Sequence, residues 1–115
     1  VGGNVTAYSD ERLKTDIETL KNALELIENI RGVSFLRNGR KGLGVVAQEL
    51  EKVLPELVNN NDDGYKSVAY ASLCCVFIEA IKELNKEVAF LKNNMVEQQT
   101  QIDVLKAEVA ELKSK

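Results

Sequence analysis

Histidine is absent from this chain of 115 residues. Without imidazole the chain cannot form a Ser-His-Asp triad, and no histidine can serve as a base or a metal ligand. No apolar run approaches the roughly 20 residues that span a bilayer, so we expect no membrane contact. The net charge is −3, and the basic face that nucleic-acid binding calls for is missing. The chain also lacks a cofactor motif or a glycine-rich phosphate loop, which argues against a conventional trans-acting enzyme.

Cysteine is equally scarce, with two residues that are neighbours, Cys74 and Cys75. A disulfide between adjacent residues of a helix would be strained, and two thiols without histidine cannot complete a zinc site. We therefore predict two reduced, buried thiols, no metal and no cofactor.

What the chain does contain begins with a short head. Apolar residues spaced three and four apart predict an amphipathic helix from Thr15 to about Asn29, with Thr15 or Asp16 as its cap. Two hairpins are expected, one pairing residues 33–37 with 43–46 across a turn-rich connector at 38–42, and one around the polar loop 59–64. Between them, residues 47–54 predict a short helix with Leu50, Val53 and Leu54 pointing inward, and Pro55 closes it.

A long helix is predicted from near Ala69 to the last residues, with an unbroken heptad pattern. Positions a of this seam are Cys74, Ile81, Val88, Met95, Ile102 and Val109, and positions d are Phe77, Leu84, Leu91, Gln98, Leu105 and Leu112. Such a pattern is typical of a coiled coil. In a parallel arrangement Glu87 would face Lys92 of the next strand, and Glu108 would face Lys113, so we predict parallel strands. β-branched residues at a favour a dimer, whereas Gln98 and Phe77 at d fit that rule poorly.

Ser9 and Lys14 form the candidate chemical site. In a chain without histidine, lysine is the most plausible base for a nucleophilic serine. A free lysine has a pKa of about 10.4, so Lys14 would need burial, for example against Leu13 and Ile17, to act as a base. Residues five apart do not share a helix face, so the pair would have to meet across a turn or be completed by a neighbouring subunit.

Three sequence blocks carry a resemblance to a known family. They are Ser9-Asp10-Glu11-Arg12-Leu13-Lys14-Thr15-Asp16-Ile17, then Gly44-Val45-Val46-Ala47-Gln48-Glu49-Leu50 with Leu54-Pro55-Glu56-Leu57-Val58, and the run from Tyr70 through Leu84. In this order they resemble the intramolecular chaperone auto-processing domain, the self-cleaving C-terminal domain of phage tailspike, tail-fibre and endosialidase proteins.

The resemblance implies a fold and a reaction. It implies an α+β head at residues 9–72 and a parallel, trimeric coiled-coil stalk at residues 73–115, while residues 1–8 would end an upstream fibre or spike. On the warrant of the family we favour the trimer over the dimer. It further implies single-turnover self-cleavage between Tyr8 and Ser9, with Ser9 as nucleophile and Lys14 as base.

Each supporting residue of this site has two possible roles, one chemical and one structural. Arg12 is either an oxyanion donor or a surface residue. Asp10 and Asp16 either orient Lys14 or Arg12, or act as a turn former and a helix cap, and we favour the cap for Asp16. For Gln48 and Glu49 we favour exposed positions on a short helix over a role in the core or against the fibre.

The implied partners are two further copies of the chain and the upstream fibre of the same polypeptide. The expected location is a virion precursor in the cytoplasm of the host bacterium, with release after cleavage. A non-cleaving coiled-coil oligomerisation module is the main alternative. A related domain of membrane-tethered transcription factors, such as the myelin regulatory factor, ranks lower.

Overall fold

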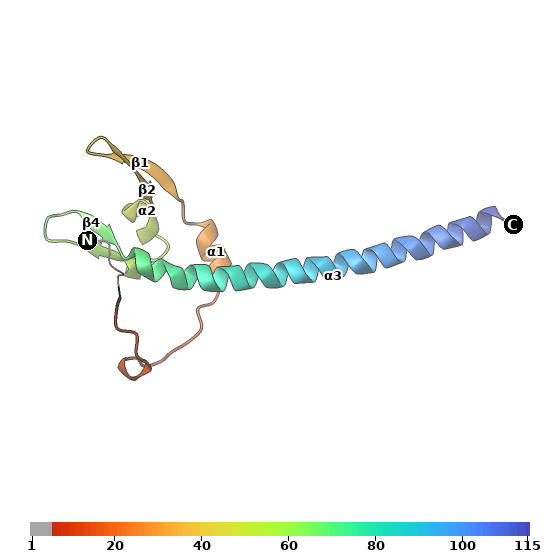
Figure 1. Cartoon of the computed structure of the whole chain (residues 1–115), viewed down its shortest axis with the longest axis horizontal. Coiled ribbons are helices and arrows are strands. Elements are labelled where there is room, and N and C mark those ends of the chain that lie inside the picture. The colour runs from red at the N-terminus through yellow and green to blue at the C-terminus, as the bar shows by residue number, and fades with distance from the viewer. Residues whose placement is uncertain (1–5) are drawn as a thin grey trace.

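The computed structural model describes residues 6–115 and shows an elongated molecule of 84 × 44 × 30 Å. A small head sits at one end of a long C-terminal helix (Figure 1). The predicted α+β head with short hairpins and a long helix is confirmed. Residues 1–8 were predicted to end an upstream fibre or spike. Of these, residues 1–5 lie outside the described residues, and residues 6–8 have no regular secondary structure.

Ten elements follow one another along residues 6–115. They are η1 (Glu11–Leu13), α1 (Ala23–Glu28), β1 (Val33–Arg37), β2 (Arg40–Gly44), α2 (Ala47–Glu51), η2 (Pro55–Leu57), β3 (Val58–Asn60), β4 (Lys66–Val68), η3 (Tyr70–Ser72) and α3 (Leu73–Lys113).

The first helix differs from its prediction, because α1 covers only the second half of residues 15–29. Asp16 and Asn22 have φ angles of 54° and 57°, and this left-handed conformation is incompatible with a continuous right-handed helix. The proposed capping role of Asp16 is therefore wrong, as is that of Thr15.

A carboxylate from a distant helix caps α1 instead. Glu83 of α3 accepts hydrogen bonds from the backbone N–H groups of Ala23 at 2.9 Å and Leu24 at 3.1 Å. The first N–H groups of a helix have no partner within it, and a carboxylate there also interacts favourably with the helix dipole. The start of α1 thus depends on a residue 60 positions away, which local sequence could not reveal.

The two hairpins are confirmed, but their bounds differ from the prediction: β2 ends at Gly44 instead of residue 46, and β3 extends to Asn60, into the loop predicted at 59–64. β1 pairs antiparallel with β2 from Val33 opposite Gly44 to Arg37 opposite Arg40, and β3 pairs with β4. The turn of the first hairpin is only Asn38-Gly39, both at positive φ, so β2 begins at Arg40 instead of residue 43. Asn-Gly favours this two-residue turn because both residues tolerate that conformation.

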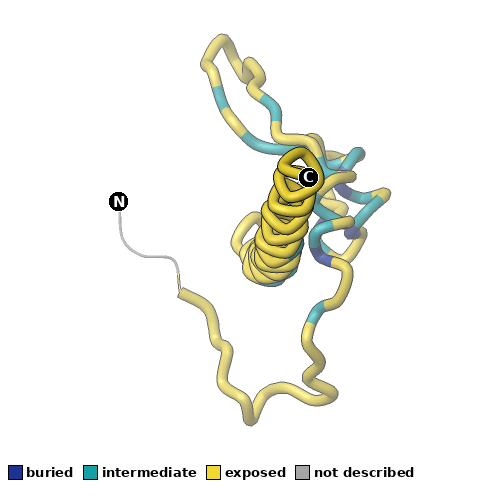
Figure 2. The backbone as a smooth tube through the Cα atoms, turned by 90° about the vertical axis from the view of Figure 1, so that its right-hand side faces the viewer, coloured by how far each residue is buried: buried dark blue, intermediate teal, exposed yellow. Residues whose placement is uncertain are grey.

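The core of the head lies where α1, α2 and β3 meet the start of α3. Seven buried apolar residues form it: Ala23, Leu50, Leu54, Val58, Leu73, Val76 and Ala80. Of the three residues predicted to point inward, Leu50 and Leu54 are buried and Val53 is partly buried against the core. The helix α2 is shorter than predicted, with its last helical residue at Glu51. Figure 2, viewed along α3, shows this burial on one side of the helix, close to the head.

α3 has two apolar faces with different surroundings. Leu73, Val76 and Ala80 are buried against the head. The predicted a and d positions lie on another face and stay exposed; Ile81 is 66% exposed and Met95 is 68% exposed. Cys74 and Cys75 are exposed as well, so the prediction of buried thiols is wrong for the single chain.

None of the helices in residues 6–115 combines the length and the apolar character required for a membrane crossing.

The cap on α1 gives a test of the head. Replacing Glu83 with Ala leaves two partly buried N–H groups without their acceptor, so we expect the free energy of unfolding to fall by about 0.5–2 kcal/mol. Glu97→Ala, at an exposed position farther along α3, is the control and should have little effect. Urea unfolding followed by circular dichroism measures both; equal midpoints for the two variants would contradict the capping role.

Candidate functional site

The N-terminal arm, defined as residues 6–22, carries the predicted chemical site. It extends away from the head as a loop (Figures 1 and 2). Its only helical element is the single turn η1. Every residue of the arm is exposed except Leu20, which is half-buried. Tyr8, before the predicted cleaved bond, is 95% exposed.

Ser9 and Lys14 meet across this turn. Lys14 Nζ donates to Ser9 Oγ at 2.6 Å and to the Ser9 carbonyl oxygen at 3.3 Å. Two backbone hydrogen bonds build the turn, from Leu13 N–H to the Asp10 carbonyl and from Lys14 N–H to the Glu11 carbonyl. The turn brings the predicted nucleophile and the predicted base within hydrogen-bonding distance.

Asp10 and Arg12 stabilise the same turn from outside the pair. The Asp10 carboxylate accepts a hydrogen bond from the Arg12 backbone N–H at 2.8 Å and from the guanidinium Nε and Nη2 at 3.0 and 2.9 Å. The arginine side-chain hydrogen bonds are the main reason why the pKa of Asp10 lies below its ordinary value, and they raise the pKa of Arg12. Both side chains therefore stay charged, and Asp10 acts as turn former and arginine partner together.

This geometry separates the candidate site residues into two groups. Tyr8, Ser9, Asp10, Arg12 and Lys14 lie together around η1, whereas Asp16 follows the turn and is not one of its hydrogen-bonding residues. Arg12 engages Asp10 through two guanidinium nitrogens.

The single chain does not bury Lys14, the predicted base. Leu13 and Ile17, the apolar neighbours predicted to desolvate Lys14, are 69% and 65% exposed. Lys14 is exposed too, and it donates its hydrogen bonds instead of accepting one. The side chains of Ser9 and Lys14 are therefore in contact, but the predicted base lies in water.

Sequence reasoning missed several contacts that hold the head together. Glu49, of the Ala-Gln-Glu block, pairs with Arg31 through two hydrogen bonds of 3.1 and 2.6 Å, which lowers the pKa of Glu49. Gln48 beside it is exposed, as expected. The Tyr70 hydroxyl accepts a hydrogen bond from Val45 N–H at 3.1 Å. The two contacts join residues that are separated by 18 and 25 positions in the sequence. No local sequence pattern predicts such contacts.

Between residues 6 and 115, no group of three or more cysteine, aspartate or glutamate side chains is arranged to hold an ion.

Comparisons with known proteins bear on the same segment. A family model named for peptidase family S74, and described as the chaperone of endosialidase, matches residues 9–59, beginning at Ser9. The chain is also 32% identical over 107 residues to the long tail fiber protein Gp37 of Salmonella phage S16, which covers 82% of this chain and 14% of that protein.

Two further relatives carry the same printed name. Gp37 of Enterobacteria phage K3 is 33% identical over 104 residues, covering 81% of this chain and 8% of the relative. Gp37 of Enterobacteria phage M1 is 30% identical over 101 residues, covering 77% of this chain and 40% of the relative. The chain therefore spans a minor part of each of these relatives. Residues 9–59 match the chaperone of endosialidase family, and the resemblance drawn from the sequence blocks is confirmed.

Proposed function

We propose that this chain is an intramolecular chaperone of a phage tail fibre that assembles through α3 and then cuts itself free at the Tyr8–Ser9 bond. The observation that carries the proposal is the 2.6 Å hydrogen bond between Lys14 Nζ and Ser9 Oγ, at the first residue of the family match. The names of the relatives support the tail fibre as the protein served.

The proposed reaction uses the backbone of the chain as its substrate. Ser9 Oγ attacks the carbonyl carbon of Tyr8 while Lys14, once neutral, accepts the hydroxyl proton. The C–N bond breaks and the Ser9 amine leaves as the new N-terminus, which gives an ester between Tyr8 and the Ser9 oxygen. Water then hydrolyses this ester. Each chain reacts once and releases residues 9–115.

The timing of the reaction follows from the exposure of the arm. A neighbouring copy that covered Leu13 and Ile17 would remove water from around Lys14 and favour its neutral form. The site would then become competent only in the assembled state. Cleavage before assembly would separate the chaperone from its fibre too early.

The seam of α3 supports assembly with further copies. Apart from Gln98 its a and d positions carry apolar residues or Cys74, and they remain exposed along the helix although the head is folded. Burial of an apolar seam between parallel helices drives coiled-coil formation, and the Glu87–Lys92 and Glu108–Lys113 pairs suit parallel strands. We propose the trimer, in keeping with the family.

Such an assembly would assist a long β-rich fibre. Fibres with many non-local contacts fold slowly and expose aggregation-prone edges meanwhile. Holding three chain ends in register makes later strand pairing effectively intramolecular. Removal of the chaperone afterwards leaves the fibre protected by a high barrier to unfolding.

A non-cleaving oligomerisation module is the second candidate, and the exposure of Lys14 favours it. In that case the exposed seam would perform the whole function. The Ser9–Lys14 contact would then only shape the turn.

Intact mass under denaturing conditions tests the cleavage. We expect the wild-type chain, expressed with its upstream fibre and assembled, to appear as a fragment that begins at Ser9. Ser9→Ala removes the nucleophile and Lys14→Ala removes the base, so both should stay whole. Lys21→Ala, another exposed lysine of the arm, should be cut like the wild type. An uncut wild-type chain in a trimer would leave only the oligomerisation module.

The Asp10–Arg12 pair gives a test of positioning. Asp10→Ala removes the acceptor that shapes η1, so we expect release of residues 9–115 to slow by about tenfold or more, since small displacements of reacting groups are costly. Glu11→Ala, at the neighbouring exposed position, should change the rate little. Rates are measured by quantifying the released fragment over time. Equal rates for Asp10→Ala and the wild type would show that the pair does not position Lys14.

Oxidative cross-linking tests the register of the seam. In parallel, in-register helices the Cys74 residues of neighbouring copies lie side by side at an a position, whereas Cys75 lies outside the seam. We expect mild oxidation to give covalent dimers with Cys75→Ser but not with Cys74→Ser, on a non-reducing gel.

Light scattering should give three times 12.8 kDa for the uncut chain; the mass of a single chain would contradict the assembly.

A further inference from the structure

The β1–β2 hairpin places two arginines directly opposite each other. Arg37 and Arg40 are cross-strand partners that flank the Asn38-Gly39 turn. Directly opposite residues of an antiparallel pair project to the same face, and like charges at such positions destabilise a hairpin. Within residues 6–115 neither guanidinium has an ion pair or hydrogen bond to a side chain.

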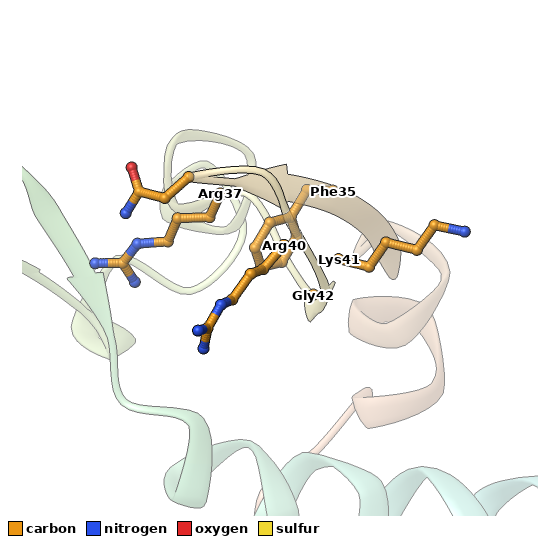
Figure 3. A pocket seen from close by; sticks show the side chains of 6 residues that line it. Phe35, Arg37, Arg40, Lys41 and Gly42 are labelled. Carbon is orange, nitrogen blue, oxygen red and sulfur yellow. The ribbon is translucent and has the colours of Figure 1, made fainter.

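The surroundings of this pair leave room for a ligand. Figure 3 shows Arg37 and Arg40 pointing to one side of the hairpin, while Lys41 points away from them. Phe35 lies over Gly42, whose hydrogen atom leaves room for the ring: a Cβ there would come within 2.7 Å of it. A hollow is lined by Phe35, Arg37, Asn38, Arg40, Lys41 and Gly42.

Two neighbouring guanidinium groups are suited to one kind of ligand. Their planar N–H donors match the oxygens of a carboxylate or phosphate and can bind them with two parallel hydrogen bonds. An oxyanion at this place would also neutralise the like-charge pair. The chemistry of the hairpin tip therefore fits carboxylate groups.

The second hairpin of the same head presents such groups. Asp62 and Asp63 occupy the exposed loop between β3 and β4. One oxygen of Asp63 accepts a hydrogen bond from Tyr65 N–H, and within the described residues neither aspartate is paired with a cation. Both hairpins project from the end of the molecule opposite the C-terminus (Figure 1).

We propose that the Arg37–Arg40 pair of one copy binds the Asp62–Asp63 loop of the neighbouring copy. Each copy carries both patches, so in a rotationally symmetric assembly the contact repeats from copy to copy and closes into a ring. The inference rests on the proposed parallel assembly through α3. It assigns the two hairpins to holding the heads together around the top of the stalk.

A charge-swap cycle on the full chain tests this contact. The first variant carries Arg37→Glu with Arg40→Glu, the second carries Asp62→Arg with Asp63→Arg, and the third carries all four changes. The first variant keeps like charges opposite each other, so the hairpin itself is affected little. The loss of the Asp63–Tyr65 turn hydrogen bond occurs in both members that carry the aspartate changes, so it cancels in the coupling between the two sites.

We expect each of the first two variants to lower Tm by about 4–8 °C at low salt, and the fourfold variant to recover at least half of the combined loss. The recovery should vanish in 1 M NaCl, where the screening length is about 3 Å. Lys52→Glu combined with Asp62→Arg and Asp63→Arg is the control. It adds a negative charge at an exposed position that does not line the hollow, so it should give no recovery.

Light scattering on every sample separates this inference from the proposed function. A wild-type chain that is monomeric overturns the assembly and the contact together. An assembled wild type whose variants lose stability additively overturns only the contact between heads. If the losses are additive and inorganic phosphate raises the wild-type Tm but not that of Arg37→Glu with Arg40→Glu, the pair binds a free oxyanion and the contact between copies is wrong.

Discussion

The division of α3 into two apolar faces is the constraint on which the rest of the structure depends. One face packs Leu73, Val76 and Ala80 against the head, and the other leaves the heptad seam in water. Seven buried residues are a small core for a chain of this length, and small cores contribute little stability by themselves. In the proposed assembly, burial of the seam between copies would supply much of the remaining stability and would couple folding to assembly.

The last residue of the arm, Asn22, is held close to the same helix. Asn22 directly precedes Ala23, whose N–H group is bound by Glu83 on α3. The end of the arm is thus fixed to the helix that carries the seam, while η1 keeps Ser9 and Lys14 in contact by local hydrogen bonds alone. This arrangement presents a preformed but solvated pair at the side of the stalk. A surface brought by a neighbouring copy can then change its solvation without having to build its geometry.

Sequence reasoning succeeded where the physical signal is local or periodic. The two hairpins, the long helix α3 and the inward residues Leu50, Val53 and Leu54 follow from turn residues, periodicity and burial, and the structure has all of them. The contact between Ser9 and Lys14 was expected across a turn, and a turn makes it. The catalytic roles of these residues come from the family resemblance and stay predictions.

The misplaced start of the first helix has a distant cause, because a partner far along the chain outweighed a local preference. Residues 15–22 have helical spacing, yet a helix there would have had its apolar side in water, since Ile17 finds no core to contact. Glu83 instead fixes the start of α1 at Ala23, beyond the left-handed residues Asp16 and Asn22. The exposed thiols have a related origin. Cys74 follows the heptad pattern, so its burial was to be expected between copies and not within the one chain, where the head covers a different face of α3.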